Sequence, residues 1–379
     1  MHLTADGTLP KDGSRGTLVG RVDRPGLGPS VVAIRAEGVF DVTDAFPTTA
    51  DLFERENPVA ALAAVKGDRI GSLQDILDGK GGQLLSPIDV QVVKAAGVTF
   101  AISMVERVIE EQAKGSPERA SAIRAEIGDI IGGELRGLKP GSPEAMALKS
   151  HLIERGLWSQ YLEVGIGPDA EIFTKAPVLS SVGTGADVGL HPISTWNNPE
   201  PEVVLVVTSK GRIVGATLGN DVNLRDVEGR SALLLGKAKD NNASAALGPF
   251  VRLFDATFSL DHVRAMKLRL KVSGDDGFVM EGSSDMAAIS RDPEDLATQT
   301  LGPHHQYPDG FVLYCGTLFA PVQDRGAPGK GFTHALGDEV TISSDELGCL
   351  ANRVRLSTEC PPWRFGLRDL MASLRARGK

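Results

Sequence analysis

Three carboxylates flank two apolar runs in the middle of the chain. Glu200 and Glu202 precede the run Val203-Val-Leu-Val-Val, and Asp221 closes the run that starts at Ile213. Oxygen-only ligands favour hard divalent cations such as Mg²⁺, Mn²⁺ or Ca²⁺ over Zn²⁺. These residue types therefore predict a metal site, provided that the fold brings the three side chains together.

A β-hairpin would bring them together. The two apolar runs flank Lys210-Gly211, a pattern that is typical of a tight hairpin turn. With these two residues as the turn, Ser209 pairs with Arg212. Counting outward along both strands then places Glu200 opposite Asp221.

The same hairpin places all three carboxylates on one face of the sheet. Glu200 and Glu202 are two residues apart, so their side chains point to the same side, and Asp221 shares that side because directly paired residues do. Like charges this close repel unless a cation lies between them. A solvated acidic hairpin end is the alternative, but the strands are apolar on both faces, and Pro199 and Pro201 stiffen the backbone, which suits a rigid, buried site.

Basic residues that follow the hairpin are candidates to meet an anionic substrate. They are Arg225, Lys237 and Lys239. A lysine close to a metal can hold a substrate carboxylate or stabilise an enolate oxygen. A solvated surface position is the alternative for each lysine.

The composition argues against several classes of function. The net charge is −9 and no long run of like charges is present, so we expect no nucleic-acid partner. No apolar stretch is long enough to span a membrane, and the first residues lack the apolar core of a secretory peptide. The cysteines Cys315, Cys349 and Cys360 have no metal-binding or redox spacing, which indicates free thiols in a reducing compartment. We therefore expect a cytoplasmic protein without a membrane partner.

The elements that must position these residues follow from periodicity and turn signals. Ser116 and Ser142 each begin a Ser-Pro-Glu run, which is a helix start signal. Between Tyr161 and Asn352, short β-rich runs alternate with Gly and Pro turns. We expect strands within residues 15–42 and 86–93, a glycine-rich linker at 132–141, a docked C-terminal helix at 365–375, and further helices at 47–65, 72–78, 102–114, 116–131 and 142–156.

Several motifs occur together in the chain: Glu200-Pro-Glu202, Asn220-Asp-Val-Asn-Leu-Arg-Asp226, Lys239, Gly248-Pro249, Gly316-Thr317 and Leu336-Gly-Asp338. As a set they resemble the fumarylacetoacetate hydrolase superfamily. The resemblance implies an α+β fold, with a mixed β-roll C-terminal domain and a smaller N-terminal α/β lobe. It implies Glu200, Glu202 and Asp221 as ligands of Mg²⁺ or Mn²⁺, Lys239 as a catalytic residue, and a homodimer or homotetramer.

The resemblance also divides the chain. We expect an N-terminal lobe at residues 1–94 and a catalytic domain at residues 95–379, which includes a helical insertion at residues 102–157. Hydrolases of the superfamily carry a His–Glu pair that activates water. In the matching run here the glutamate is Glu106, but the histidine position is Ser103. Serine cannot act as a base at neutral pH, so this departure favours a lyase over a hydrolase of carbon–carbon bonds.

Within the superfamily, longer runs resemble the 2-keto-3-deoxy-pentonate dehydratases. The resemblance implies that a small 2-keto sugar acid of the D-xylonate or D-arabinonate type, or its L-epimer, is converted to 2-oxoglutarate semialdehyde through a metal-stabilised enolate. A hydrolase that cleaves a 2,4-diketo-3-deoxy sugar acid and releases pyruvate is the alternative. The runs are residues 157–164, 169–175, 196–200, 237–244, 304–310 and 331–334.

The same resemblance assigns roles to individual residues. Glu106 is expected to act as acid or base, and Lys239 to stabilise the enolate charge or protonate the leaving hydroxyl. The expected substrate contacts are Ser103, Lys239, Asn242, Thr317 and Ser180.

Overall fold

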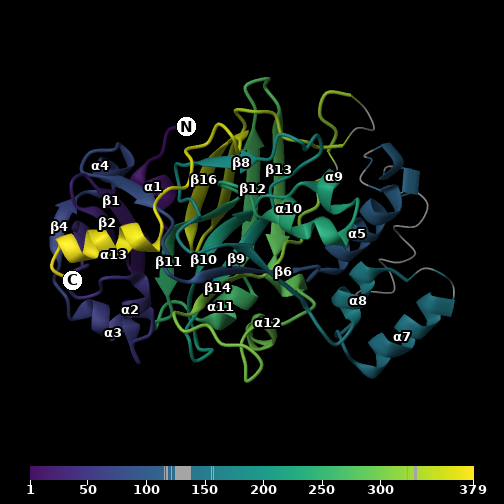
Figure 1. Cartoon of the computed structure of the whole chain (residues 1–379), viewed down its shortest axis with the longest axis horizontal. Coiled ribbons are helices and arrows are strands. Elements are labelled where there is room, and N and C mark those ends of the chain that lie inside the picture. Colours follow the sequence, from purple (N-terminus) through teal and green to yellow (C-terminus); the bar gives the residue numbers. More distant parts are fainter. Residues whose placement is uncertain are drawn as a thin grey trace.

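Two β-sheets form the centre of the molecule, and helices lie at both ends (Figure 1). The computed structural model describes residues 1–379 except 115, 117, 121, 124–137, 155, 157, 322 and 328–330. The helix expected at 116–131 and the linker expected at 132–141 lie largely outside the described residues.

The larger sheet has eleven strands, which come from both the expected N-terminal lobe and the expected catalytic domain. Its order is β4 (Asp68–Gly71), β3 (Gly38–Asp41), β2 (Gly28–Arg35), β1 (Leu18–Arg24), β11 (Ala245–Leu253), β10 (Ile213–Asp221), β9 (Pro201–Val207), β14 (Phe311–Tyr314), β6 (Val92–Gly97) and β7 (Glu171–Ala176), and β5 (Gln83–Leu85) pairs with β1. The smaller sheet has five strands, in the order β13 (Val279–Asp285), β12 (Lys267–Ser273), β15 (Glu339–Ser344), β16 (Gly348–Leu356) and β8 (Asp187–Leu190).

The strands expected within residues 15–42 are confirmed as β1, β2 and β3. They continue the sheet of the catalytic strands, because β1 pairs directly with β11 at Leu18–Arg252 and Val19–Val251. The boundary expected at residue 94 falls inside β6. The division into two domains therefore stays a prediction, and the sheet runs across it.

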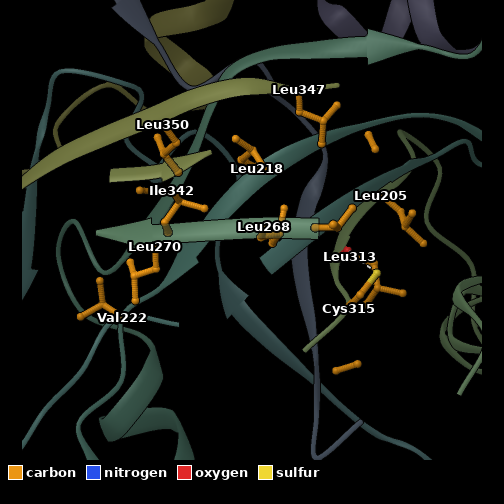
Figure 2. Close-up of a cluster of buried hydrophobic side chains, with 14 of the residues drawn as sticks. Leu205, Leu218, Val222, Leu268, Leu270, Leu313, Cys315, Ile342, Leu347 and Leu350 are labelled. Atoms are coloured by element: carbon orange, nitrogen blue, oxygen red, sulfur yellow. Dashed lines mark hydrogen bonds between the residues drawn. The ribbon is translucent and has the colours of Figure 1, made fainter. Parts of the chain in front are cut away.

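The main core lies between the two sheets and contains side chains from both, such as Leu205, Leu218, Leu268 and Ile342 (Figure 2). Side-chain alternation explains how β9 can be buried along its whole length. Its odd-numbered residues from Val203 to Val207 face this core, and its even-numbered valines face a second core that is covered by helices of the N-terminal part.

The helices are short, and most of them begin directly after a residue whose side chain caps the N-terminus. The single helix expected at 47–65 is two helices, because Asn57 caps a new helix that has Pro58 in its first turn. The helices are α1 (Ala5–Thr8), α2 (Thr49–Phe53), α3 (Pro58–Ala63), α4 (Leu73–Leu77), α5 (Ala101–Ala113), α7 (Pro143–Glu154), α8 (Gln160–Ile166), α9 (Arg225–Glu228), η1 (Ala232–Leu234), α10 (Leu235–Lys239), α11 (Leu260–Arg264), η2 (Met286–Ala288), α12 (Pro293–Thr300) and α13 (Leu367–Ala376).

The expected helices at 72–78, 102–114, 142–156 and 365–375 are confirmed as α4, α5, α7 and α13. The α13 helix lies beside the N-terminal strands, at the opposite end of the molecule from α5, α7 and α8 (Figure 1). It docks through the buried Leu370, whereas Leu367 and Met371 of its apolar stripe stay exposed. Among the described residues, no helix is both long and apolar enough to cross a lipid bilayer.

The strand expected at residues 86–93 is wrong over most of its length. Strand β6 begins only at Val92. The Arg21 guanidinium donates to the carbonyls of Ser86 and Ile88, at 3.3 and 2.7 Å, and the Asp89 carboxylate accepts from the amide of Thr49. The Arg21 side chain therefore binds backbone carbonyls of this segment that would otherwise accept hydrogen bonds from a neighbouring strand.

Candidate metal centre and adjoining cavity

The hairpin of β9 and β10 has a longer turn than predicted. The Thr208 amide donates to the Arg212 carbonyl at 3.0 Å, so Thr208 pairs with Arg212. The predicted pairing of Ser209 with Arg212 is therefore wrong. The reason is tertiary, because the Glu54 carboxylate accepts from the Ser209 amide at 2.6 Å and from its hydroxyl at 2.8 Å.

A bulge in β10 cancels this difference. It lies just after Ile213, and beyond it Gly219 pairs with Glu202, as the predicted count requires. The Asp221 amide donates to the Glu200 carbonyl at 3.1 Å. The predicted pairing of Glu200 with Asp221 is therefore confirmed, although the turn itself differs.

The three carboxylates form a buried cluster. Each of Glu200, Glu202 and Asp221 offers one oxygen, and these oxygens lie within 4.8 Å of one another. The three residues are only 4%, 2% and 2% exposed, which excludes the solvated hairpin end. In the described part of the chain, no other group of three His, Cys, Asp or Glu residues could hold one ion. An all-oxygen set of this spacing fits the expected Mg²⁺ or Mn²⁺.

A donor from elsewhere in the fold binds one oxygen of each carboxylate. The Arg107 guanidinium donates to Glu200 Oε1 at 2.6 Å, and the Gly316 amide donates to Glu202 Oε2 at 2.6 Å.

The Lys175 ammonium, which is fully buried, lies 2.7 Å from Asp221 Oδ1. These three contacts hold one oxygen of each carboxylate in a fixed direction.

The structure distinguishes between the two candidate lysines. Lys237 is exposed, whereas Lys239, at the end of α10, is buried with its Nζ 2.5 Å from Glu200 Oε2 and 3.1 Å from Asp221 Oδ2. Burial lowers the pKa of Lys239, but the Asp221 and Glu200 carboxylates outweigh burial and raise the pKa above its usual value. The lysine is therefore a cation beside the three carboxylates.

The carboxylates differ in how readily they ionise. Burial, followed by the charges of Asp221 and Glu200, holds the pKa of Glu202 well above its usual range. Burial alone would also raise the pKa of Asp221, but the charges of Lys175 and Lys239 have the larger combined effect. The net result is a pKa below the usual value of an aspartate. A divalent cation would favour the ionised form of all three.

Helix α5 presents one polar face to the cluster. Ser103, Glu106, Arg107 and Glu110 follow the i, i+3, i+4, i+7 spacing, and they line a cavity together with Glu200 and Thr317. The apolar residues of the opposite face, such as Val108 and Ile109, pack in the core that α5 shares with α7 and α8. Because the apolar face of α5 packs against α7 and α8, its charged face is left to line the cavity beside the carboxylates.

Glu106 is buried beside Arg225, whose Nη2 is 3.6 Å from Glu106 Oε2. The same guanidinium lies 2.6 Å from Glu110 Oε1 and stacks 4.3 Å from the ring of Trp196. The structure thus places Glu106 in the cavity lined by α5, with Arg225 as its neighbour.

Strand β7 contributes three side chains that the sequence reasoning did not assign. Glu171, Phe173 and Lys175 alternate along the strand and so share one face. The first two line a second cavity, together with Glu202 and Asp221. Alternation along the strand could have shown that these side chains share a face, but only the tertiary structure shows that this face lines the cavity.

Glu171 has an unusual environment. Gly97 lies directly opposite it in β6, and a side chain at position 97 would meet the Glu171 carboxylate, so glycine provides the space. Burial, followed by the Glu228 charge, raises the pKa of Glu171 to about 7, against the opposing effects of Arg107 and Lys239. A carboxyl group with this pKa can exchange a proton at neutral pH.

The other expected substrate contacts separate into two groups. Ser103 and Thr317 line both cavities. Ser180 and Asn242 do not line either one: Ser180 donates to the Pro177 carbonyl at 2.7 Å, and the Asn242 amide donates to backbone carbonyls near the C-terminus. The structure therefore does not bring these two side chains to the carboxylate cluster.

Comparison with known proteins places the chain among its relatives. The family described as fumarylacetoacetate (FAA) hydrolase C-terminal matches residues 147–355. The chain is 31% identical over 185 residues to the 2-dehydro-3-deoxy-D-arabinonate dehydratase of Saccharolobus solfataricus, which covers 49% of this chain and 58% of that protein. It is 27% identical over 201 residues to the "Probable 2-keto-3-deoxyxylonate dehydratase" of Haloferax volcanii, which covers 53% and 65%. The match thus spans less than two thirds of either relative's length.

A solved structure shows the same fold. It is that of a 2-keto-3-deoxy-D-arabinonate dehydratase complexed with magnesium and 2,5-dioxopentanoate, and it has a TM-score of 0.64 at 22% identity, covering 89% of this chain and 99% of that chain. These matches confirm the expected α+β fold and the resemblance to the pentonate dehydratases. Because the family match extends over more than half of the chain, this protein belongs to the fumarylacetoacetate hydrolase family.

Proposed function

We propose that this protein is a metal-dependent dehydratase of a 2-keto-3-deoxy-pentonate. The observation that carries the proposal is the buried cluster of Glu200, Glu202 and Asp221 with the Lys239 ammonium beside it. Two relatives named as dehydratases of such acids, and a fold match to a structure that contains magnesium and a small keto acid, support the same choice.

The three carboxylates would hold Mg²⁺ or Mn²⁺. A bound divalent ion would act as a Lewis acid toward the carboxylate and 2-keto oxygens of the substrate and so acidify the neighbouring methylene group. Lys239, which is protonated when the substrate binds, stabilises negative charge on the keto oxygen or donates a proton to the leaving hydroxyl.

The reaction also needs a base that removes a proton from C3. Loss of the C4 hydroxyl as water, followed by tautomerisation of the C5 alcohol to an aldehyde, then gives 2-oxoglutarate semialdehyde. Two carboxyl groups are candidates for this base. Glu171 lines the cavity that contains Glu202 and Asp221, whereas Glu106 lines the adjoining cavity beside Arg225. We favour Glu171 because of its position and its pKa near neutrality.

A substrate screen tests the proposal. Purified protein is incubated with D- and L-2-keto-3-deoxy-pentonates, with Mg²⁺ or with a chelator, and the products are identified. We expect semialdehyde formation that requires the metal. Release of pyruvate from a 2,4-diketo-3-deoxy acid would instead identify a hydrolase, and turnover that is unaffected by complete metal removal would contradict the role of the cluster.

A further inference from the structure

Arg107 connects the metal centre to two other parts of the chain. Its Nη2 donates to Glu200 Oε1 at 2.6 Å, and its Nη1 lies 2.8 Å from Glu110 Oε2 and 2.9 Å from Glu228 Oε2. The side chain is 13% exposed, so solvent hardly screens these contacts. One guanidinium therefore binds a candidate metal ligand, its own helix α5 and helix α9.

This arrangement can affect cation binding in two opposite ways. A positive charge near the site repels a divalent ion, so Arg107 as a mere counter-charge would weaken metal affinity. A donor that holds a ligand in the binding orientation strengthens metal affinity, and loss of such a partner typically costs about 10- to 100-fold. The two roles predict opposite results when the arginine is removed.

The geometry points to the second role, and we propose that Arg107 is a positioning residue that orients Glu200 for the metal. With Oε1 bound to Arg107, the other oxygen, Oε2, lies on the side of the cluster where Lys239 Nζ donates both to it and to Asp221 Oδ2. The guanidinium is itself held in place through its Nη1, which lies 2.8 Å from Glu110 Oε2 and 2.9 Å from Glu228 Oε2. This inference rests on the proposed metal site and adds to it a residue that acts through a ligand.

Arg225 provides a matched control. It is buried and pairs with Glu110 through its Nε at 2.7 Å, as Arg107 does through Nη1. Its hydrogen bonds, ion pairs and ring contact are with Glu106, Glu110, Trp196 and the Pro321 carbonyl, and not with Glu200, Glu202 or Asp221. A change at Arg225 therefore disturbs the same ionic network on α5 without releasing a candidate metal ligand.

The test measures Mg²⁺ binding to the full chain by calorimetry at pH 8, without substrate. Arg107→Met is expected to weaken the affinity about 10- to 100-fold, in the range found for other partners of metal ligands. Arg107→Lys keeps the charge but cannot hold Glu200, Glu110 and Glu228 with one rigid fork, so we expect a loss of at least about threefold. Arg225→Met is expected to stay within about threefold of the wild type.

The outcomes separate this inference from the proposed function. If the wild-type protein does not bind Mg²⁺, the proposed metal site itself fails. If the wild type binds Mg²⁺ and Arg107→Met binds it equally well or more tightly, only the positioning role is overturned. A loss in Arg225→Met equal to that in Arg107→Met would also overturn it. If Arg107→Met does not fold, as judged by circular dichroism, the Arg107→Lys result decides on the same criterion.

Discussion

A carboxylate that binds a metal has two oxygens, and in this protein each candidate ligand has one oxygen bound by a donor other than Lys239, which contacts the second oxygens of Glu200 and Asp221. Arg107, Lys175 and the Gly316 amide serve Glu200, Asp221 and Glu202, respectively. Such partners restrict the rotation of the ligands and so reduce the entropy that is lost when a metal binds. The cluster is therefore organised by residues that lie outside the hairpin.

Gly316 is the residue on which the orientation of Glu202 depends. Its φ of +89° is unfavourable for any side chain, and a Cβ would lie 2.0 Å from Thr99 Oγ1. Gly316→Ala should therefore shift the amide away from Glu202 and weaken Mg²⁺ binding about tenfold, as measured by calorimetry. Gly277→Ala is the control, because Gly277 also has a positive φ of +80° but has open space around it. Equal affinities in the two variants would contradict this role of the amide.

The base is the second question at the scale of residues. If Glu171 removes the proton, it must be ionised, and its pKa of about 7 means that the ionised fraction falls as the pH drops below 7. Bound Mg²⁺ would lower this pKa, so with saturating Mg²⁺ the decrease of kcat/KM, about tenfold per pH unit, should begin below pH 7. Glu171→Gln should lower kcat about 10²- to 10⁴-fold with Mg²⁺ affinity retained. Full loss in Glu106→Gln, with normal turnover in Glu171→Gln, would assign the base to Glu106 instead.

Among the elements, the pair of β6 and β7 decides where this acid lies. The antiparallel register puts Gly97 opposite Glu171, and a Cβ on Gly97 would lie 2.0 Å from Glu171 Oε2 and 2.7 Å from its Cδ. The strand pairing thus provides both the position of the carboxyl group and the space for it.

Gly97→Ala should displace Glu171 without touching the metal hairpin. We expect kcat to fall at least about tenfold, because a positioned acid or base contributes about 10²- to 10⁴-fold. Calorimetry should show unchanged Mg²⁺ affinity in the same sample, which serves as the internal control. A variant with unchanged kcat would show that the position of Glu171 is unimportant for turnover.

On the scale of the whole molecule, the cluster carries a cost for folding that a metal would remove. Three buried carboxylates repel one another, and the raised pKa of Glu202 records this, with burial as its largest cause. A ligand that binds only the folded state stabilises it, by about 2.7 kcal/mol at a hundredfold excess over Kd. Metal binding and global stability are therefore linked.

Glu202→Gln isolates this link. The neutral amide mimics the protonated carboxyl that the raised pKa of Glu202 favours, so the variant should unfold at the same or a higher temperature than the wild type in the presence of a chelator. Added Mg²⁺ should raise the unfolding temperature of the wild type by several degrees. It should leave that of the variant unchanged. Calorimetric melting curves check both statements, and a full Mg²⁺ response in the variant would remove Glu202 from the ligand set.

The candidate ligand set and its approximate arrangement could be predicted from the sequence, because residue type, alternation and pairing across a turn are local properties. Alternation along a strand and pairing across a turn placed Glu200 opposite Asp221, and the apolar runs indicated burial. The actual turn is longer by one residue and β10 contains a compensating bulge. The predicted pairing of Glu200 with Asp221 is therefore right only because the bulge compensates for the longer turn, and no local sequence pattern predicted either feature.

What surrounds the carboxylates was decided by the tertiary structure. Arg107 and Lys175 are separated from the ligands that they contact by 93 and 46 residues, respectively. The expected contacts Ser180 and Asn242 bind backbone carbonyls away from the cluster. Sequence alone determined which side chains have the chemistry to hold a hard cation, since that depends on residue type and short-range spacing. Only the tertiary structure decided which basic side chains neutralise these carboxylates. The reason is that the contacts join residues that are far apart in the sequence.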